Sequence, residues 1–67
     1  MYTVFKINLD NTLSNKEHLN DDELGAWMYD YAYNKFATIK VVQDFTNKFC
    51  IYTDNGKDFE LIDRGYL

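Results

Sequence analysis

The sequence predicts a small α+β domain, in the order β-α-β-β-β, whose one helix packs on one face of an antiparallel sheet. Three observations lead to this prediction. Residues 20–36 have the apolar period of a helix, the flanking segments are short and rich in β-branched and aromatic residues, and an Asn-Gly pair joins two of those segments. Since 67 residues suffice for one hydrophobic core, we expect residues 1–67 to form a single domain.

We expect the first strand at residues 2–9, where side chains alternate between two faces. The face that we expect to be buried under the helix holds Phe5, Ile7 and Leu9. The opposite face holds Tyr2, Val4, Lys6 and Asn8.

The next segment, residues 10–19, is polar and begins with two turn-forming residues, Asp10 and Asn11. We therefore predict a loop there. Ser14 and Glu17 have the spacing of a capping box, so one short turn of helix is the alternative.

The helix is predicted at residues 20–36, and its first turn carries a start signal. Asn20 can accept from the free amides of that turn, and the Glu23 carboxylate can accept from the Asn20 N–H. Asp21 and Asp22 add negative charge at the positive end of the helix dipole. An apolar stripe follows, made of Leu24, Trp27, Met28 and Tyr31. We expect this stripe to pack on the sheet, and Gly25 to let the helix approach a strand closely.

The opposite face of the helix combines tyrosines with carboxylates. At about 100° per residue, this face contains Asp22, Tyr29, Asp30 and Tyr33. Tyrosine offers a large amphipathic area with only two side-chain torsions to freeze, and it is enriched in binding surfaces. We therefore expect this face to bind a partner. The alternative is that the rings fold down over the flanks of the helix.

Three more strands are predicted after the helix, at residues 37–43, 49–53 and 58–63, with a turn at 44–48 and a tail at 64–67. Asn55-Gly56 predicts a two-residue type I′ turn, in which both residues have positive φ. The resulting cross-strand pairs are Asp54 with Lys57, Tyr52 with Phe59, and Cys50 with Leu61.

Both faces of the predicted sheet carry large apolar groups, whereas an antiparallel sheet usually keeps one face polar. The face away from the helix is expected to hold Tyr2, Val4, Val42, Phe49, Ile51 and Ile62. Contiguous exposed apolar surface generally marks an interface. We therefore expect this face, the tyrosine face of the helix or an open strand edge to meet another protein.

The sequence contains no catalytic, metal-binding or phosphate-binding motif, and we predict neither an enzyme nor a bound cofactor. His18, the only histidine, lies in a polar segment without a predicted nucleophile beside it. Cys50, the only cysteine, excludes an internal disulfide and agrees with a reducing compartment. No apolar run is long enough to span a bilayer, so we predict a cytoplasmic protein, in the host cytoplasm if it is phage-encoded, that does not bind membranes.

The chain has 11 acidic and 7 basic residues and a net charge of −4. It lacks the basic stripe that neutralises phosphates, so we do not expect it to bind nucleic acid directly. A protein with a basic surface is the expected partner. The scattered carboxylates are either an ordinary solvated surface or an imitation of the phosphate spacing of nucleic acid.

In size, acidity, tyrosine content and strand-helix-strand order, the chain resembles small phage-encoded proteins that disable host machinery. These include inhibitors of CRISPR effectors, RNA polymerase and DNA-repair glycosylases. The resemblance implies an inhibitor of a host enzyme that partly occupies a basic groove. The residues expected to bind the partner are Asp22, Tyr29, Asp30, Tyr33, Asp58 and Glu60. The alternative function is structural, a self-associating assembly protein that forms a homodimer through the uncovered sheet face.

Overall fold

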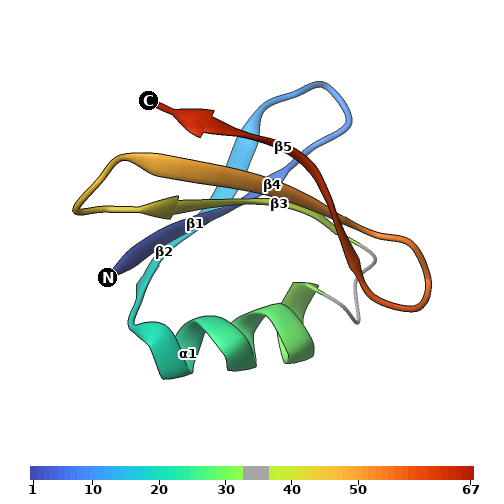
Figure 1. Ribbon diagram of the computed structural model, residues 1–67. Coiled ribbons are helices and arrows are strands. Elements are labelled where there is room, and N and C mark those ends of the chain that lie inside the picture. Colours follow the sequence, from blue (N-terminus) through green and yellow to red (C-terminus); the bar gives the residue numbers. More distant parts are fainter. Residues whose placement is uncertain (33–36) are drawn as a thin grey trace.

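The computed structural model contains a five-stranded antiparallel sheet in the order β2-β1-β3-β4-β5 (Figure 1). It describes residues 1–32 and 37–67. The strands are β1 Tyr2–Ile7, β2 Leu13–Leu19, β3 Thr38–Gln43, β4 Lys48–Asp54 and β5 Phe59–Tyr66. This confirms a small antiparallel sheet accompanied by one short helix, a structure that is mostly sheet.

The polar segment that we expected to be a loop contains strand β2, so the element order is β-β-α-β-β-β. β2 pairs with β1 from Leu19 opposite Tyr2 to Leu13 opposite Ile7, with a bulge near Asn15, whose φ is 55°. Most of its side chains are exposed because β2 is an edge strand. The loop prediction was wrong because the periodicity of apolar residues indicates only which side chains are buried. An exposed edge strand is held by main-chain hydrogen bonds, and these do not require apolar residues at alternate positions.

The helix begins where the sequence predicts. Asn20 Oδ1 accepts from the Glu23 N–H at 2.8 Å, and the Glu23 carboxylate accepts from the Asn20 N–H at 3.0 Å, which confirms the capping box. The helix α1 spans Asp21–Ala26 and continues as a π-helix, η1, over Trp27–Ala32. Residues 33–36 of the predicted helix lie outside the described residues. π-Helical turns are rare and occur frequently at functional sites.

A buried cluster joins β1, β2, β3 and the helix. Its members are Val4, Leu19, Trp27, Ala37, Ile39 and Val41. Around it pack the partly buried Tyr2, Leu24, Met28, Tyr52 and Phe59. Trp27 Nε1 also donates to the Glu17 carboxylate at 2.8 Å, which ties the helix to β2.

The face of β1 that we expected to be buried is the opposite one in the structure. Val4 is fully buried and lies opposite Val41 of β3, whereas Phe5 lies opposite Lys40 and Leu9 is fully exposed. β3 is the central strand, and it directs Ile39 and Val41 into the cluster. Val4 must share their face, and because side chains alternate along a strand, this reverses the whole of β1. Tyr2 and Val4 therefore do not belong to the outer face.

The hairpin turn between β4 and β5 has four residues, 55–58, instead of the predicted two. Gly56 has a φ of 90°, but Asn55 has no positive φ, so the type I′ prediction was wrong. Side chains organise the longer turn: the Asp54 carboxylate accepts from the Gly56 N–H at 2.8 Å, and Asn55 Oδ1 accepts from the Lys57 and Asp58 amides at 3.0 Å.

The longer turn moves the register of the hairpin by two residues. Asp54 now lies opposite Phe59 and Tyr52 opposite Leu61, and a bulge follows before Cys50 meets Arg64. A shift of two keeps each side chain on its predicted face as far as the bulge. Residues 64–66 continue β5 in place of the predicted tail.

The outer face of the sheet carries Val42, Phe49 and Ile51, as predicted, together with Phe5. Lys40 Nζ lies 4.9 Å from the centre of the Phe49 ring. On β5, a Cβ atom on Gly65 would come within 3.2 Å of the same ring, so the glycine makes room for Phe49. The apolar side chains of this face are therefore packed to a large extent within the chain itself.

Candidate partner-binding surface

The helix and the β4-β5 hairpin enclose a groove with a volume of about 390 Å³. It is lined by Gly25, Met28, Tyr29, Lys57, Asp58 and Phe59. Met28 and Phe59 also contact the buried cluster, so they form an apolar floor. Tyr29, Lys57 and Asp58 provide the polar groups around that floor. We call this feature the helix-hairpin groove.

Among the apolar and aromatic side chains of the groove, Tyr29 is the most exposed, with 76% of its surface accessible. It lies in η1, two residues after the buried Trp27. Asp58 reaches the same groove from the hairpin turn, where its N–H donates to Asn55 and its carboxylate accepts from the Phe59 N–H at 2.7 Å. Hydrogen bonds to Asn55 and Phe59, within the turn and directly after it, thus orient Asp58.

The structure brings together two of the predicted binding residues, Tyr29 and Asp58. Asp22 and Asp30 are exposed on the helix but do not line the groove. Glu60 is exposed on β5 and, one residue after Phe59, points to the opposite face of the sheet. Tyr33 lies outside the described residues.

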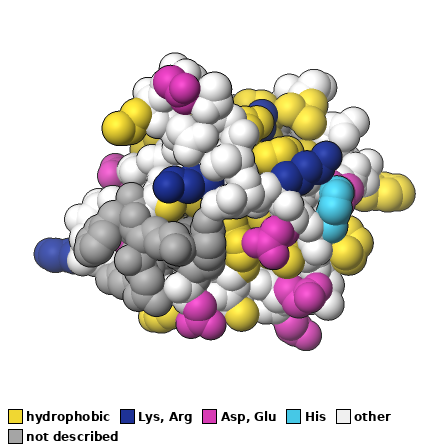
Figure 2. Space-filling model, turned by 180° about the vertical axis from the view of Figure 1, so that it is seen from behind, with side chains coloured by type: hydrophobic (Ala, Val, Ile, Leu, Met, Phe, Trp, Pro, Cys, Tyr) yellow, Lys and Arg dark blue, Asp and Glu magenta, His cyan; other side chains and the backbone are white. Residues whose placement is uncertain are grey.

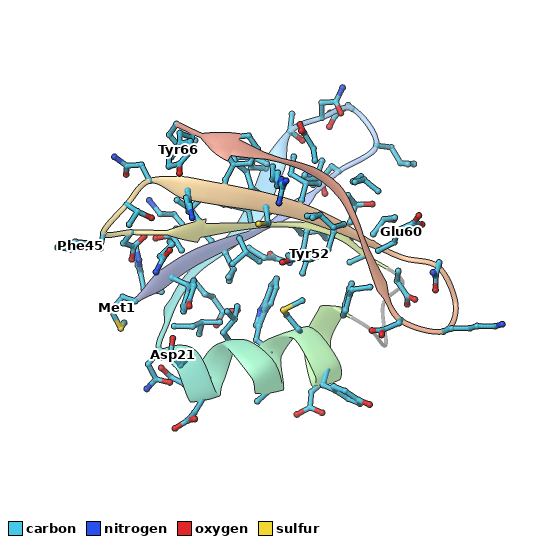
Figure 3. The ribbon with its side chains drawn as sticks, in the orientation of Figure 1. Met1, Asp21, Phe45, Tyr52, Glu60 and Tyr66 are labelled. Carbon is cyan, nitrogen blue, oxygen red and sulfur yellow. The ribbon has the colours of Figure 1, made fainter. Side chains whose placement is uncertain are left out.

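In Figure 2, several acidic side chains lie along the lower edge of the molecule, where Figure 1 places the helix, and others lie in the centre and near the top of the view. The first helical turn contains the acidic residues Asp21, Asp22 and Glu23. Figure 3 shows Glu60 near the hairpin turn and Asp21 at the start of the helix, so the carboxylates are spread over the surface instead of converging on one point. Such a distribution creates a broad negative field and no compact charge cluster.

The groove residues that the sequence pattern did not identify are Gly25, Met28, Lys57 and Phe59. A Cβ atom on Gly25 would meet no atom within 4 Å, so this glycine leaves the groove open and does not serve the close helix-strand approach that we expected. The sequence predicts Met28 only as part of the helix stripe that packs on the sheet, and Phe59 only as the cross-strand partner of Tyr52. Their position in the groove depends on the distance between the hairpin and the helix, which the periodicity of the sequence does not predict.

Outside the helix-hairpin groove, a polar cluster connects β1, β2 and the turn after β3. Thr3 Oγ1 donates to the Asp44 carboxylate at 2.5 Å and lies 3.0 Å from His18 Nδ1. Because the hydroxyl has only one proton, the bond to His18 requires Nδ1 to donate. The threonine proton is therefore directed at a carboxylate. A hydroxyl activated by histidine would instead donate its proton to the imidazole. The cluster holds the sheet together at the largely buried Thr3.

Among the described residues, three titratable groups have a shifted pKa, and none of them lines the helix-hairpin groove. The Asp21 carboxylate raises the pKa of Tyr2, mainly through its charge and further through a hydrogen bond. Burial raises the pKa of Tyr52, with a further contribution from Cys50. Hydrogen bonds from Thr12 lower the pKa of Asp10.

Within residues 1–32 and 37–67, no group of three or more His, Cys, Asp or Glu side chains is arranged to hold a metal ion. No helix in that part of the chain is both long enough and apolar enough to cross a lipid bilayer. Comparison with known protein families, with curated proteins and with solved structures finds no significant match to this chain.

Proposed function

We propose that this protein is a small acidic binding module that inhibits a host enzyme by docking its helix-hairpin groove on a basic surface of that enzyme. The observation that supports the proposal most directly is the position of Tyr29, which is 76% exposed beside Asp58 and above an apolar floor. Asp22 and Asp30 extend the acidic surface along the helix. In this proposal the protein belongs to the functional class of small phage inhibitors.

The groove has the chemistry of a protein-binding surface. A tyrosine ring buries a large apolar area on docking while its hydroxyl keeps a polar contact at the rim. Met28 adds an adaptable apolar contact in the floor. The surrounding carboxylates attract a positively charged partner and fix its orientation. Trp27 belongs to the buried cluster that the helix shares with the sheet, whereas Tyr29, two residues later, is exposed.

Nucleic-acid enzymes are the first candidates because their grooves are basic. We would add the protein to transcription by a bacterial RNA polymerase and to target cleavage by a CRISPR effector, each at low and at high salt. We expect inhibition of at least one reaction, with a half-inhibitory concentration that rises with salt because charge steering is screened. An absence of inhibition in both reactions at low salt would contradict the proposal for this class of enzyme.

The chain offers a matched control for the groove. Tyr66 is 68% exposed and lies at the far end of β5, so Tyr29→Lys and Tyr66→Lys make the same chemical change at similarly exposed sites (Figure 3). We expect Tyr29→Lys to abolish inhibition and Tyr66→Lys to preserve it. Equal inhibition by the two folded variants would mean that the helix-hairpin groove is not the binding surface.

The alternative, a homodimer through the uncovered sheet face, has weaker support. Phe5, Phe49 and Ile51 of that face are already half-buried in the isolated chain, and Lys40 lies over the Phe49 ring. The area left for a partner on this face is correspondingly small.

A further inference from the structure

We infer that a pocket between β4 and β5 binds a small phosphate monoester, with Lys48 and Arg64 as the two groups that hold the phosphate. The pocket has a volume of about 410 Å³ and lies on the part of these strands remote from their turn (Figure 1). It is lined by Lys48, Phe49, Cys50, Arg64, Gly65 and Tyr66. We call it the β4-β5 pocket. None of these residues lines the helix-hairpin groove, so the inference does not depend on the proposed inhibition.

The register of the two strands shows how the pocket is built. Four side chains form its walls and lie on one face of the sheet as two cross-strand pairs, Lys48 with Tyr66 and Cys50 with Arg64. The pair between them, Phe49 and Gly65, faces the other way, so its main chain forms the floor. The pocket is therefore a space between four walls that the strand pairing fixes.

The two cations of the pocket have no carboxylate beside them in its walls. Lys48 and Arg64 are diagonal neighbours across the two strands, a separation that long side chains can span. Asp63 lies opposite Ile51, on the outer face of the sheet, and its carboxylate accepts from the Arg64 N–H at 2.8 Å. No acidic side chain is among the described residues that line the pocket. Like charges on neighbouring strands repel each other, and a bound anion would relieve this repulsion.

The chemistry of the two cations favours a phosphate over a carboxylate. Lys48 Nζ lies 5.9 Å from the centre of the Tyr66 ring, a cation–π contact that orients this charge. The Arg64 guanidinium offers a planar fork that can bind two phosphate oxygens, while an ammonium group binds phosphate as a point charge. A phosphate monoester carries a charge of about −1.5 to −2 near pH 7, which matches two cations, whereas a carboxylate matches only one.

The size of the pocket and the charge of the remaining surface favour a small molecule. The volume of about 410 Å³ lies within the range of roughly 300 to 1,000 Å³ that is usual for small-molecule pockets, so it has room for an ester group beside the phosphate. A nucleic acid would require a basic stripe for successive phosphates. The chain has 11 acidic residues, and none of them lines this pocket, so they would repel a longer chain of phosphates.

The test is an amide NMR titration of the whole protein with glucose 6-phosphate, at low salt and in a buffer without phosphate. We expect saturable shifts that are largest at residues 48–50 and 64–66. Inorganic phosphate should bind more weakly because it lacks the ester group, and acetate because it carries a single charge. A titration that does not approach saturation by about 10 mM ester would overturn the inference, and so would equal affinity for inorganic phosphate or acetate. Tighter binding of a single-stranded oligonucleotide than of the ester would overturn the assignment to a small molecule.

Variants of the two cations test their role, and Lys16 provides a matched control. All three side chains are exposed, and Lys16 lies on β2 at the other edge of the sheet. Lys48→Gln and Arg64→Gln should each raise the dissociation constant by roughly threefold to tenfold, as expected for an exposed charged contact, with an unchanged circular dichroism spectrum. Lys16→Gln should bind like the wild type. Arg64→Lys keeps the charge and loses the fork, so its affinity should lie between those of Arg64→Gln and the wild type. Wild-type affinity in Arg64→Gln, or an equal loss in Lys16→Gln, would overturn the inference.

Discussion

Replacing Val4 by alanine tests the arrangement of the core, because Val4 is fully buried against Val41 and sits on the face that the sequence pattern assigned to solvent. The change removes two methyl groups, which corresponds to about 1.6 kcal/mol of transfer free energy at about 0.8 kcal/mol per group. The cavity left behind adds to this loss, so we expect the free energy of unfolding to fall by roughly 2 to 3 kcal/mol. A domain of this size has a total of only about 3 to 10 kcal/mol.

Urea unfolding followed by tryptophan fluorescence measures this loss. Trp27 is the only tryptophan and is 8% exposed in the same cluster, so its emission reports the packing around Val4. With a slope of about 1 kcal/mol per molar urea, the midpoint should fall by about 2 to 3 M. The control is Leu9→Ala at a fully exposed position, which should change the stability by less than about 0.5 kcal/mol. The reasoning is refuted if Leu9→Ala costs as much as Val4→Ala.

Three further predictions concern the helix, the hairpin and the pH dependence. Gly25→Ala should raise the free energy of unfolding by about 0.5 to 1 kcal/mol, because the new Cβ meets open space in a helix. Gly56→Ala should lower the free energy of unfolding by about 1 to 2 kcal/mol, because the φ of Gly56 is 90°. Urea titration of both variants checks that the two changes have opposite signs. Glu17→Ala should cost about 1 to 2 kcal/mol and shift the Trp27 emission to longer wavelength, since the indole N–H of the buried Trp27 loses this acceptor; an unchanged spectrum would count against this bond. The raised pKa of Tyr52 favours the neutral phenol in the folded state, so the contribution of Tyr52 to stability is complete below about pH 10 and is lost as the pH rises through the folded pKa. Tyr52→Phe should therefore lessen the fall of the urea midpoint at alkaline pH. An equal fall in the wild type and in Tyr52→Phe would exclude Tyr52 as the cause.

The parts of the fold that depend on local chemistry were predictable from the sequence. Asn20 and Glu23 form the expected capping box because the bonds involved span only three residues. Trp27 is buried, and Tyr29 is exposed on the opposite side of the helix, because both follow from the helical period.

The features that depend on neighbouring strands were not predictable in the same way. β1 has apolar side chains on both faces, and only the pairing of Val4 with Val41 decides which face is buried. β2 has no apolar alternation, because most of its side chains are exposed. In the hairpin, the side-chain bonds of Asp54 and Asn55 outweigh the preference of Asn-Gly for a shorter turn.

The candidate site shows the same division. Tyr29 and Asp58 were both identified as surface residues, but their meeting in one groove depends on how far the hairpin reaches toward the helix. Glu60 was grouped with Asp58 because it is close in sequence, yet strand alternation sends it to the other face. Sequence reasoning therefore identified the residue types of the proposed binding surface and only part of their arrangement.

The most direct test of the central claim is an amide NMR titration of the protein with the enzyme that is proposed as its target, at low salt. We expect signals from the groove residues Gly25, Met28, Tyr29, Lys57 and Asp58 to broaden first, while those of the β1-β2 turn, including Leu9 and Asp10, remain sharp. Broadening confined to the β1-β2 turn or to the outer face of the sheet would contradict the assignment of the helix-hairpin groove as the binding surface.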